Sequence, residues 1–469
     1  MKTLTYGNTA RATYTYDWTA RTTGIRHTKS DGTLLAGYEY SYSNAGIPTG
    51  VVEGSGDRVT WSYDSAYRLT REQRSGTNAY DLTYTWDGAG NRLTKLASGT
   101  TTTYTYNAGD ALTLENAAGT LTTYAYDSAG NTSTQNAAGS VTTYTWDDEN
   151  RMTGLVLPSG AGTWTMAYNP SGLRREKQAA GTTTRFLWDT VGGTARGVGA
   201  LLAAPSSASR LLQETDADNA TVAHYTSGLG TYGPTVSQRR SGTSSYLHGS
   251  LLGTIEALTA ADQSVSDTYL LDAWGRQIAS SGSTTNPHRY VGALGYYAES
   301  SLSLDYVRAR WLRPGTGGWM SVDPVWGSLR YAYAYAAPGV LRDPSGGLPA
   351  WLIAVGDFVT GVSSGEWAIE TMIGVGAAAG VVAAGLVIFI GEIAEGGIFV
   401  HHVAKGLNES FEANCRKCAG AYQDRLNVDP DWEPQNGVWM VGSLHCGSGD
   451  GKTWATDPQT GKLRRCRFN

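Results

Sequence analysis

Charged side chains are scarce in this sequence. Only 16% of its 469 residues are Asp, Glu, Lys or Arg, and the formal net charge is −5. General binding of nucleic acid requires a surplus of basic residues, so this composition argues against nucleic acid as a partner. Phe is also rare, with 6 residues against 28 Tyr and 15 Trp. Aromatic side chains that carry a polar group favour a two-faced β-sheet over a packed helical bundle.

Most of the sequence contains no cysteine, and its first residues do not have the pattern of a secretory signal. All four cysteines lie at or beyond Cys415, so the choice between an oxidising and a reducing compartment concerns only the C-terminal part. The first residues, MKTLTYGNTARATYTYD, lack the apolar stretch of a signal peptide. Low charge together with many aromatics argues against general disorder.

A short motif recurs through the first 280 residues. It consists of two aromatic residues separated by one residue, followed by Asp or Asn, then a Gly/Asn turn and a return strand. Between residues 87 and 147 the Asp or Asn recurs every twenty positions, which is the signature of repeated supersecondary units. The motif occurs at Tyr14–Asp17, Trp61–Asp64, Tyr84–Asp87, Tyr104–Asn107, Tyr124–Asp127 and Tyr144–Asp147.

Each unit predicts a strand, a turn and a second strand. In Thr-Thr-Tyr-Thr-Tyr the residues alternate with period two, which places the aromatics on one face and Thr on the other. The following Asp-x-x-Gly-Asn supplies residues that close a tight turn. We therefore interpret the aromatics as cross-strand packing and the Asp as a turn former. The alternative is an aromatic stripe that binds carbohydrate.

Residues 289–348 contain several spaced pieces that together resemble one family. The pieces are Arg289-Tyr290, Leu304–Arg310, Trp319–Ser321, Asp323-Pro324 and Asp343–Gly346. This segment resembles the core of RHS/YD-repeat proteins, which include RHS effectors, the C component of insecticidal toxin complexes, and teneurins. The resemblance implies a mainly β fold in which the repeats wind a spiral sheet into a shell, here complete or partial.

The resemblance also implies the division of the chain. Residues 1–286 form the repeat region and residues 287–348 form the core segment. Residues 349–400 are rich in Gly and Ala and predict an apolar helix, and residues 401–469 form a variable module that contains the cysteines. With this apolar helix, the tail is expected to be α+β.

Two aspartates of the core segment, Asp323 and Asp343, match those implicated in self-cleavage in the family. Two carboxyls held close together do not both ionise easily, so one can activate water while the other polarises a carbonyl group. Arg310 is the candidate for holding this geometry, with Arg342 as a second choice. The resemblance places the scissile bond between Leu348 and Pro349. The alternative is that the segment is a structural plug with no chemistry.

The C-terminal part leaves two further questions open. Residues 371–391 are uncharged and long enough either to contact a membrane or to form a helix buried in protein. In the module, residues 408–426 predict a helix, and short strands are expected around Trp439 and Trp454. Its cysteines fit two disulfides, which we favour, or a zinc site. They are Cys415, Cys418, Cys446 and Cys466.

These observations predict an exported bacterial protein, secreted or at the cell surface, whose shell encloses or presents a C-terminal tail of effector type. An immunity protein or a target-cell surface is then the expected partner. No catalytic motif is recognisable in the tail, and no cofactor is expected apart from zinc at the cysteines. The alternative is a non-enzymatic adhesion scaffold in which the core segment is only a cap.

Overall fold

The computed structural model describes residues 2–189, 209–228, 233–324 and 330–347, and six strands between residues 388 and 465. The chain divides into two compact units, Met1–Gly380 and Val381–Asn469, which are described separately.

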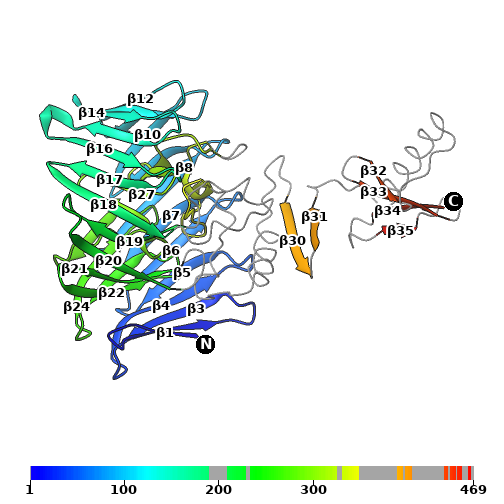
Figure 1. Ribbon diagram of the computed structural model, residues 1–469, viewed down its shortest axis with the longest axis horizontal. Helices are drawn as coiled ribbons and strands as arrows, with labels where there is room; N and C mark the ends of the chain where they lie inside the picture. The colour runs from blue at the N-terminus through cyan, green and yellow to red at the C-terminus, as the bar shows by residue number, and fades with distance from the viewer. Residues whose placement is uncertain are drawn as a thin grey trace. The chain divides into compact units, whose positions relative to one another are not determined.

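The first unit is dominated by one 25-stranded sheet (Figure 1). Its strands pair antiparallel with their neighbours along the chain, from β1–β2 to β24–β25, so the sheet is one continuous meander. This confirms the mainly β fold of repeated hairpins. The strands are β1 Lys2–Thr5, β2 Arg11–Tyr16, β3 Thr22–Thr28, β4 Leu34–Tyr42, β5 Pro48–Glu53, β6 Arg58–Tyr63, β7 Leu69–Ser75, β8 Tyr80–Trp86, β9 Arg92–Ala97, β10 Thr100–Tyr106, β11 Leu112–Ala117, β12 Thr120–Tyr126, β13 Thr132–Ala137, β14 Ser140–Trp146, β15 Met152–Val156, β16 Thr163–Tyr168, β17 Arg174–Ala179, β18 Thr182–Asp189, β19 Arg210–Thr215, β20 Thr221–Ser227, β21 Thr235–Arg240, β22 Thr243–Gly249, β23 Ile255–Thr259, β24 Val265–Leu271 and β25 Gln277–Ser281.

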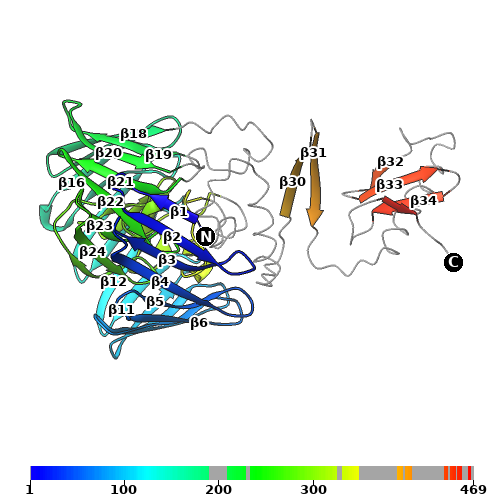
Figure 2. The same ribbon diagram turned by 90° about the horizontal axis from the view of Figure 1, so that it is seen from below.

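The sheet coils so that its first strands lie beside strands from near its end, as Figures 1 and 2 both show for β1–β3 and β22–β24. Asn8, after β1, donates from Nδ2 to Oγ1 of Thr259 at 3.2 Å, across 251 residues. The backbone nitrogen of Leu251 donates to the hydroxyl of Tyr40 at 3.0 Å, across 211 residues. Side chains therefore join the two ends of the meander.

The repeat strands alternate as their sequence predicts. In β10, Tyr104 is buried with 5% of its surface exposed, whereas Thr103 and Thr105 face solvent. Tyr84, Tyr124 and Tyr144 are buried at the equivalent positions. The first aromatic of each motif thus faces the interior, and the alternating Thr residues form the outer face.

The second aromatic of each motif has a more specific role. In most repeats a β-bulge occurs at this aromatic, and the bulge leaves one residue of the opposing strand without a register partner. The hydroxyl or indole nitrogen of the next repeat's second aromatic donates to the backbone carbonyl of the residue that pairs with the bulged aromatic in the ladder. These bonds are Tyr42 to Thr22 (2.5 Å), Trp86 to Leu69 (2.9 Å), Tyr126 to Leu112 (2.9 Å), Trp146 to Thr132 (2.7 Å), Tyr168 to Met152 (2.7 Å) and Trp188 to Arg174 (2.7 Å).

The Asp of each motif closes its own turn, as predicted. In the repeat of Asp127, Oδ1 accepts from the backbone nitrogens of Ala129 (2.9 Å) and Asn131 (2.8 Å). Oδ2 accepts from the side chain of Asn131 at 3.0 Å. In the repeat of Asp147, the residue four positions later is Arg151, which donates from Nε at 2.7 Å. The interpretation of these residues as turn formers is therefore confirmed.

The core segment packs against the inner face of this sheet. It contains a four-stranded sheet and two short 3-10 turns. The backbone nitrogen of Arg174 donates a hydrogen bond to the hydroxyl of Tyr306 at 2.9 Å. The backbone nitrogen of Thr132 donates one to the carbonyl of Met320 at 2.8 Å. Leu312 is fully buried, which stabilises the fold by about 1.5–3 kcal/mol. The elements are η3 Gly292–Leu294, β26 Tyr297–Glu299, β27 Leu304–Val307, β28 Arg310–Arg313, β29 Gly318–Trp319 and η4 Tyr333–Ala336.

The second unit corrects one prediction. Part of the region expected to be an apolar helix forms two antiparallel strands, β30 Ile388–Ala394 and β31 Gly397–Val403. The run Val387-Ile-Phe-Ile390 is β-branched and aromatic, and such residues favour strands over helices. The remainder of residues 371–391 lies outside the described part of the chain.

A four-stranded sheet follows, with β32 Val438–Val441, β33 Leu444–Gly449, β34 Lys452–Thr456 and β35 Leu463–Arg465. Trp439 is in β32 and Trp454 in β34, where short strands are predicted. The helix predicted at 408–426 lies outside the described residues. Among the residues that are described, no helix has the length and hydrophobicity needed to cross a membrane.

Candidate aspartate and arginine site

Three charged residues of the core segment meet inside the shell. Arg310 is in β28, Asp323 follows β29, and Asp343 follows η4. Nη2 of Arg310 donates to Oδ2 of Asp323 at 2.8 Å and to Oδ2 of Asp343 at 3.3 Å. The side chains of Arg310, Asp323 and Asp343 are 2%, 7% and 2% exposed. The structure thus brings together the three residues singled out from the sequence, and their role stays a prediction.

Asp343 is held in a fixed orientation by the turn that it begins. Its Oδ1 accepts from the backbone nitrogen and hydroxyl of Ser345 (3.1 and 2.8 Å) and from the backbone nitrogen of Gly346 (3.0 Å). The hydroxyl of Tyr296 donates to its backbone carbonyl at 2.7 Å. One carboxylate oxygen therefore closes the turn, and the other faces Arg310.

Arg310 also contacts the chain that leads out of the core segment. Its Nε donates to the backbone carbonyl of Gly346, two residues before Leu348. Its guanidinium lies 4.2 Å from the centroid of the Trp319 ring, a stacking contact that fixes the plane of the group. Arg310 thus connects both carboxylates to the segment where the resemblance places cleavage.

The charge of Arg310 makes the arrangement stable. Two buried carboxylates repel each other and lose hydration, and a guanidinium between them offsets both costs. Close approach of Asp323 and Asp343 is therefore tolerated because Arg310 bridges them. The sharing of one proton by the two carboxyls, expected from the sequence, stays a prediction.

Other arginines hold the surrounding backbone. Arg342, the second choice from the sequence, is buried and donates from Nη1 to the carbonyl of Leu251 at 3.3 Å. Arg308 donates to the carbonyl of Pro344 and, at 2.9 Å, to that of Ser209. Arg308 was not singled out from the sequence, although it lies two residues before Arg310 in one of the matched pieces.

Several predicted site residues are not described by the structure. Leu348 and Pro349 lie outside the described residues, as do Cys415, Cys418 and Cys466. Cys446 is in β33, but its side chain is not described. Within the described part of the chain, no group of three His, Cys, Asp or Glu side chains is arranged to hold a metal ion.

Comparison with known proteins supports this view of the repeats. The RHS Repeat family model matches residues 126–161, which contain strands β13 to β15. Over 158 residues the chain is 30% identical to the tRNA3(Ser)-specific nuclease WapA of Bacillus spizizenii and to the tRNA nuclease WapA of Bacillus subtilis. Each alignment covers 32% of this chain and 6% of the relative, so this chain spans only a small part of their length.

Two solved structures share the fold. The crystal structure of TcdB2-TccC3 aligns with a TM-score of 0.56 at 17% identity, covering 73% of this chain and 19% of that one. The Tc holotoxin pore of Photorhabdus luminescens, with a mutant TccC3, aligns with a TM-score of 0.52 at 17% identity, covering 74% and 18%. At this identity the likeness concerns the fold.

The matched repeat lies within the 25-stranded sheet, and the coiled sheet with its inner core segment has the fold of the TccC3-containing structures. The chain is therefore an RHS/YD-repeat protein.

Proposed function

We propose that this chain is the shell and core of an exported, toxin-like RHS protein that cleaves itself between Leu348 and Pro349. The released segment is the C-terminal tail, which the shell encloses or presents. The fold shared with a Tc holotoxin and the sequence match to a WapA nuclease support a toxin-like role. In this role an immunity protein or a target-cell surface is the expected partner.

The observation that carries the proposal is the position of Arg310. It contacts Asp323, Asp343 and the carbonyl of Gly346 at once. A purely structural ion pair needs only one carboxylate, whereas hydrolysis of a peptide bond by carboxyl groups needs two close together. The link to Gly346 tethers the chain two residues before the proposed scissile bond.

The proposed chemistry is hydrolysis with two carboxyl groups. One ionised carboxylate takes a proton from water, and the resulting hydroxide attacks the carbonyl carbon of Leu348. The other carboxyl, protonated, donates a hydrogen bond to the carbonyl oxygen. The bond to the nitrogen of Pro349 then breaks, and that nitrogen takes up a proton. The products are a carboxylate on Leu348 and a secondary amine on Pro349.

The test is to express the full chain and analyse it on a denaturing gel and by intact mass. We expect a fragment of residues 349–469, which is absent from Asp323→Asn and from Asp343→Asn. In Asp343→Asn the new amide keeps an oxygen that can accept the three turn hydrogen bonds of Asp343, so loss of cleavage in this variant reports the lost charge and not a broken turn.

The matched control is Asp81→Asn, because Asp81 forms a surface ion pair with Arg71 and lies in β8 of the repeat sheet. This variant should be cleaved like the original chain. A chain that stays intact at all times overturns the cleavage proposal. The alternative function then stands, in which the chain is an adhesion scaffold and the buried core segment is a structural plug.

A further inference from the structure

The segment that leaves the core, residues 343–346, is bound along its backbone. Each of its four carbonyl groups accepts a hydrogen bond from the core segment itself. The donors are the hydroxyl of Tyr296 to Asp343 (2.7 Å), Nη1 of Arg308 to Pro344, the backbone nitrogen of Ala309 to Ser345 (3.1 Å) and Nε of Arg310 to Gly346. We refer to Tyr296 and residues 308–310 as the carbonyl clamp. Three consecutive residues of the β27–β28 hairpin thus bind three successive carbonyls.

Only glycine fits at the last position of this segment. Gly346 has a φ of +71°, in the left-handed region. A Cβ there would lie 2.1 Å from the carbonyl oxygen of Val307 and 3.0 Å from the backbone nitrogen of Arg310. Both are backbone atoms, so neither can turn aside as the end of a flexible side chain can. A shift of the segment that brought Ser345 to this place is therefore excluded.

The opposite shift is prevented by Asp343. Sliding the segment the other way would bring Gly347 to the place of Gly346, where it would also fit. The same movement would put Pro344 in the place of Asp343, and the ion pair of Oδ2 with Nη2 of Arg310 at 3.3 Å would be lost. The segment is therefore held in a single register along the clamp.

Arg308 attaches the clamp to the shell. Its Nε donates to the carbonyl of Ser209, directly before β19, at 2.9 Å. Its side chain is buried, and its backbone has a φ of +48° in the turn between β27 and β28. A non-glycine residue keeps such a conformation only where its surroundings hold it. The bound segment is therefore fixed relative to the repeat sheet as well as to the core.

Arg310 connects the clamp to the carboxyl groups. Its Nε donates to the carbonyl of Gly346, whereas its Nη2 donates to Asp323 and Asp343. The chain beyond Gly346 therefore starts from a fixed point relative to both carboxyls. The distance along the chain from this point determines which peptide bond reaches them.

We propose that the carbonyl clamp selects the bond for self-cleavage by its distance along the chain, so that the bond two residues beyond Gly346 is cut whatever side chains flank it. This inference rests on the proposed cleavage between Leu348 and Pro349. Gly346 is the residue that determines specificity, and Arg308 is a positioning residue. The side chains of Leu348 and Pro349 then need no pocket of their own.

The test is to insert one alanine between Gly347 and Leu348 of the full chain, which leaves the clamp and both aspartates unchanged. Counting from Gly346 then predicts a cut between the inserted alanine and Leu348. The C-terminal fragment would begin at Leu348 in place of Pro349, and it would be heavier by one leucine residue. Intact mass spectrometry distinguishes the two fragments.

Failure of this inference can be told apart from failure of the proposed cleavage. An original chain that stays intact overturns the cleavage itself. If the original chain is cut, the inference is overturned by an insertion variant that is cut between Leu348 and Pro349 or is not cut. Selection of the bond would then depend on those two side chains.

Gly346→Ala tests the requirement for glycine. The new Cβ would force the segment away from the backbone of Val307, and a displacement of about 1 Å can lower a rate about a hundredfold. We expect a loss of this size in a time course of cell-free synthesis. The matched control is Gly119→Ala, which has a φ of +95° and a Cβ that meets nothing within 4 Å, and it should be cut at the original rate. Equal rates for Gly346→Ala and the original chain would contradict the inference.

Arg308→Met tests the positioning role, because it keeps the length of the side chain and removes its donors. We expect slower cleavage and a mixture of cut positions. Arg308→Lys keeps a donor for the carbonyl of Pro344 or of Ser209 and should restore the single cut. A single cut at the original rate in Arg308→Met would exclude a positioning role.

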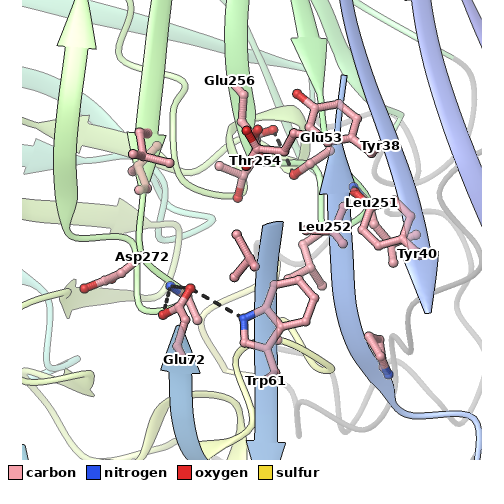
Figure 3. A pocket seen from close by; sticks show the side chains of 18 of the residues that line it. Tyr38, Tyr40, Glu53, Trp61, Glu72, Leu251, Leu252, Thr254, Glu256 and Asp272 are labelled. Carbon is pink, nitrogen blue, oxygen red and sulfur yellow. Dashed lines mark hydrogen bonds between the residues drawn. The ribbon is translucent and has the colours of Figure 1, made fainter. Parts of the chain in front are cut away.

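The control for a general loss of stability is Glu72→Ala. Glu72 accepts from the backbone nitrogen of Ala273 at 2.9 Å and from the indole of Trp61 at 3.4 Å, beside a cavity of about 80 Å³ where the coiled sheet meets itself (Figure 3). The substitution removes buried hydrogen bonds and leaves the residues of the clamp unchanged. It should therefore be cut only at the original bond. A mixture of cuts in Glu72→Ala would show that lost stability, and not the lost contacts of Arg308, scatters the cut.

Discussion

The Nδ1 atoms of His27 and His248 lie 3.1 Å apart, across 221 residues of sequence, and join β3 to β22. The protons of this buried pair can be assigned. Nε2 of His27 faces the carbonyl of Gly249 at 3.0 Å, so it carries a hydrogen. Its Nδ1 must then accept from His248, whose Nε2 accepts from Oγ1 of Thr259 at 2.8 Å. Both rings are neutral in this arrangement.

Acid should therefore open this contact. Burial lowers the pKa of His27 to about 4 and that of His248 well below its usual value. The unfolded chain has ordinary His pKa values near 6.5, so stability is retained above about pH 6.5 and lost as the pH falls toward 4. For His27 the full loss is on the order of 3 kcal/mol below the folded pKa of about 4. The measurement is the melting temperature between about pH 7 and pH 4.5.

The double variant His27→Gln/His248→Gln isolates this effect. It should melt lower at neutral pH but lose less stability on acidification. His288, whose pKa burial also lowers to about 4, remains in both chains, so the difference between them reports the pair. His224→Gln, at an exposed position of β20, should keep the original pH dependence. Identical pH profiles for the double variant and the original chain would contradict the assignment.

The ion pairs of Arg310 should contribute far more to the free energy of unfolding than ion pairs on the surface do. Arg310→Ala leaves Asp323 and Asp343 buried without their shared cation, and we expect a loss of about 3–5 kcal/mol in unfolding free energy. Arg71→Ala breaks the ion pair with Asp81, in which both side chains are 45% exposed, and should cost no more than about 1 kcal/mol. Urea denaturation of both variants makes the comparison. Similar losses would show that Arg310 does not stabilise the carboxylate pair.

The second aromatic of a repeat donates a hydrogen bond to a backbone carbonyl of the preceding repeat. This bond can be tested by removing a single hydroxyl oxygen. Tyr126→Phe removes the donor to the carbonyl of Leu112, and we expect a loss of about 1 kcal/mol. Tyr16 has the same place in the first repeat, and its buried hydroxyl has no partner among the described residues. Tyr16→Phe should therefore leave the urea midpoint almost unchanged. Equal effects of the two substitutions would show that the hydrogen bond to the carbonyl of Leu112 does not stabilise the fold.

Local patterns were sufficient to predict the repeats and their faces. Period-two alternation in strands such as β10 places Tyr104 inside, and Asp127 needs only its own turn to act as predicted. The bulge hydrogen bonds were missed, although the shortage of Phe was a signal for them, since Phe cannot donate. The strands at 388–403 were missed because Gly and Ala upstream suggested a helix and outweighed the β-branched run in the interpretation.

The candidate sites depend on contacts between distant residues. Arg310, Asp323 and Asp343 were grouped through a family resemblance, since their spacing alone does not show that one guanidinium bridges both carboxylates. The pair of His27 and His248 has no such precedent in the sequence. It forms because the sheet coils, and coiling depends on the summed twist of many strands. A contact between residues more than two hundred positions apart cannot be predicted from the pattern of a short stretch of sequence.

The close packing between the core segment and the sheet is most sharply tested at Gly317. Its φ of +69° and its neighbours both require glycine, because a Cβ there would lie 2.3 Å from Nη2 of Arg92 and 2.5 Å from the ring of Trp274. Arg92 is buried, with its guanidinium 4.3 Å from the Trp274 ring centroid. Gly317→Ala must therefore displace a buried cation–aromatic contact, as well as strain the backbone.

The matched control is Gly119→Ala, in the turn between β11 and β12. Its φ is +95°, but a Cβ there meets nothing within 4 Å. It should show backbone strain alone, of about 1 kcal/mol, whereas Gly317→Ala should lose a further 1–3 kcal/mol or so from overpacking. Urea midpoints of the two variants give the difference. Equal losses would mean that Arg92 and Trp274 move aside freely, and that the core segment is less tightly packed against the sheet than the contact distances indicate.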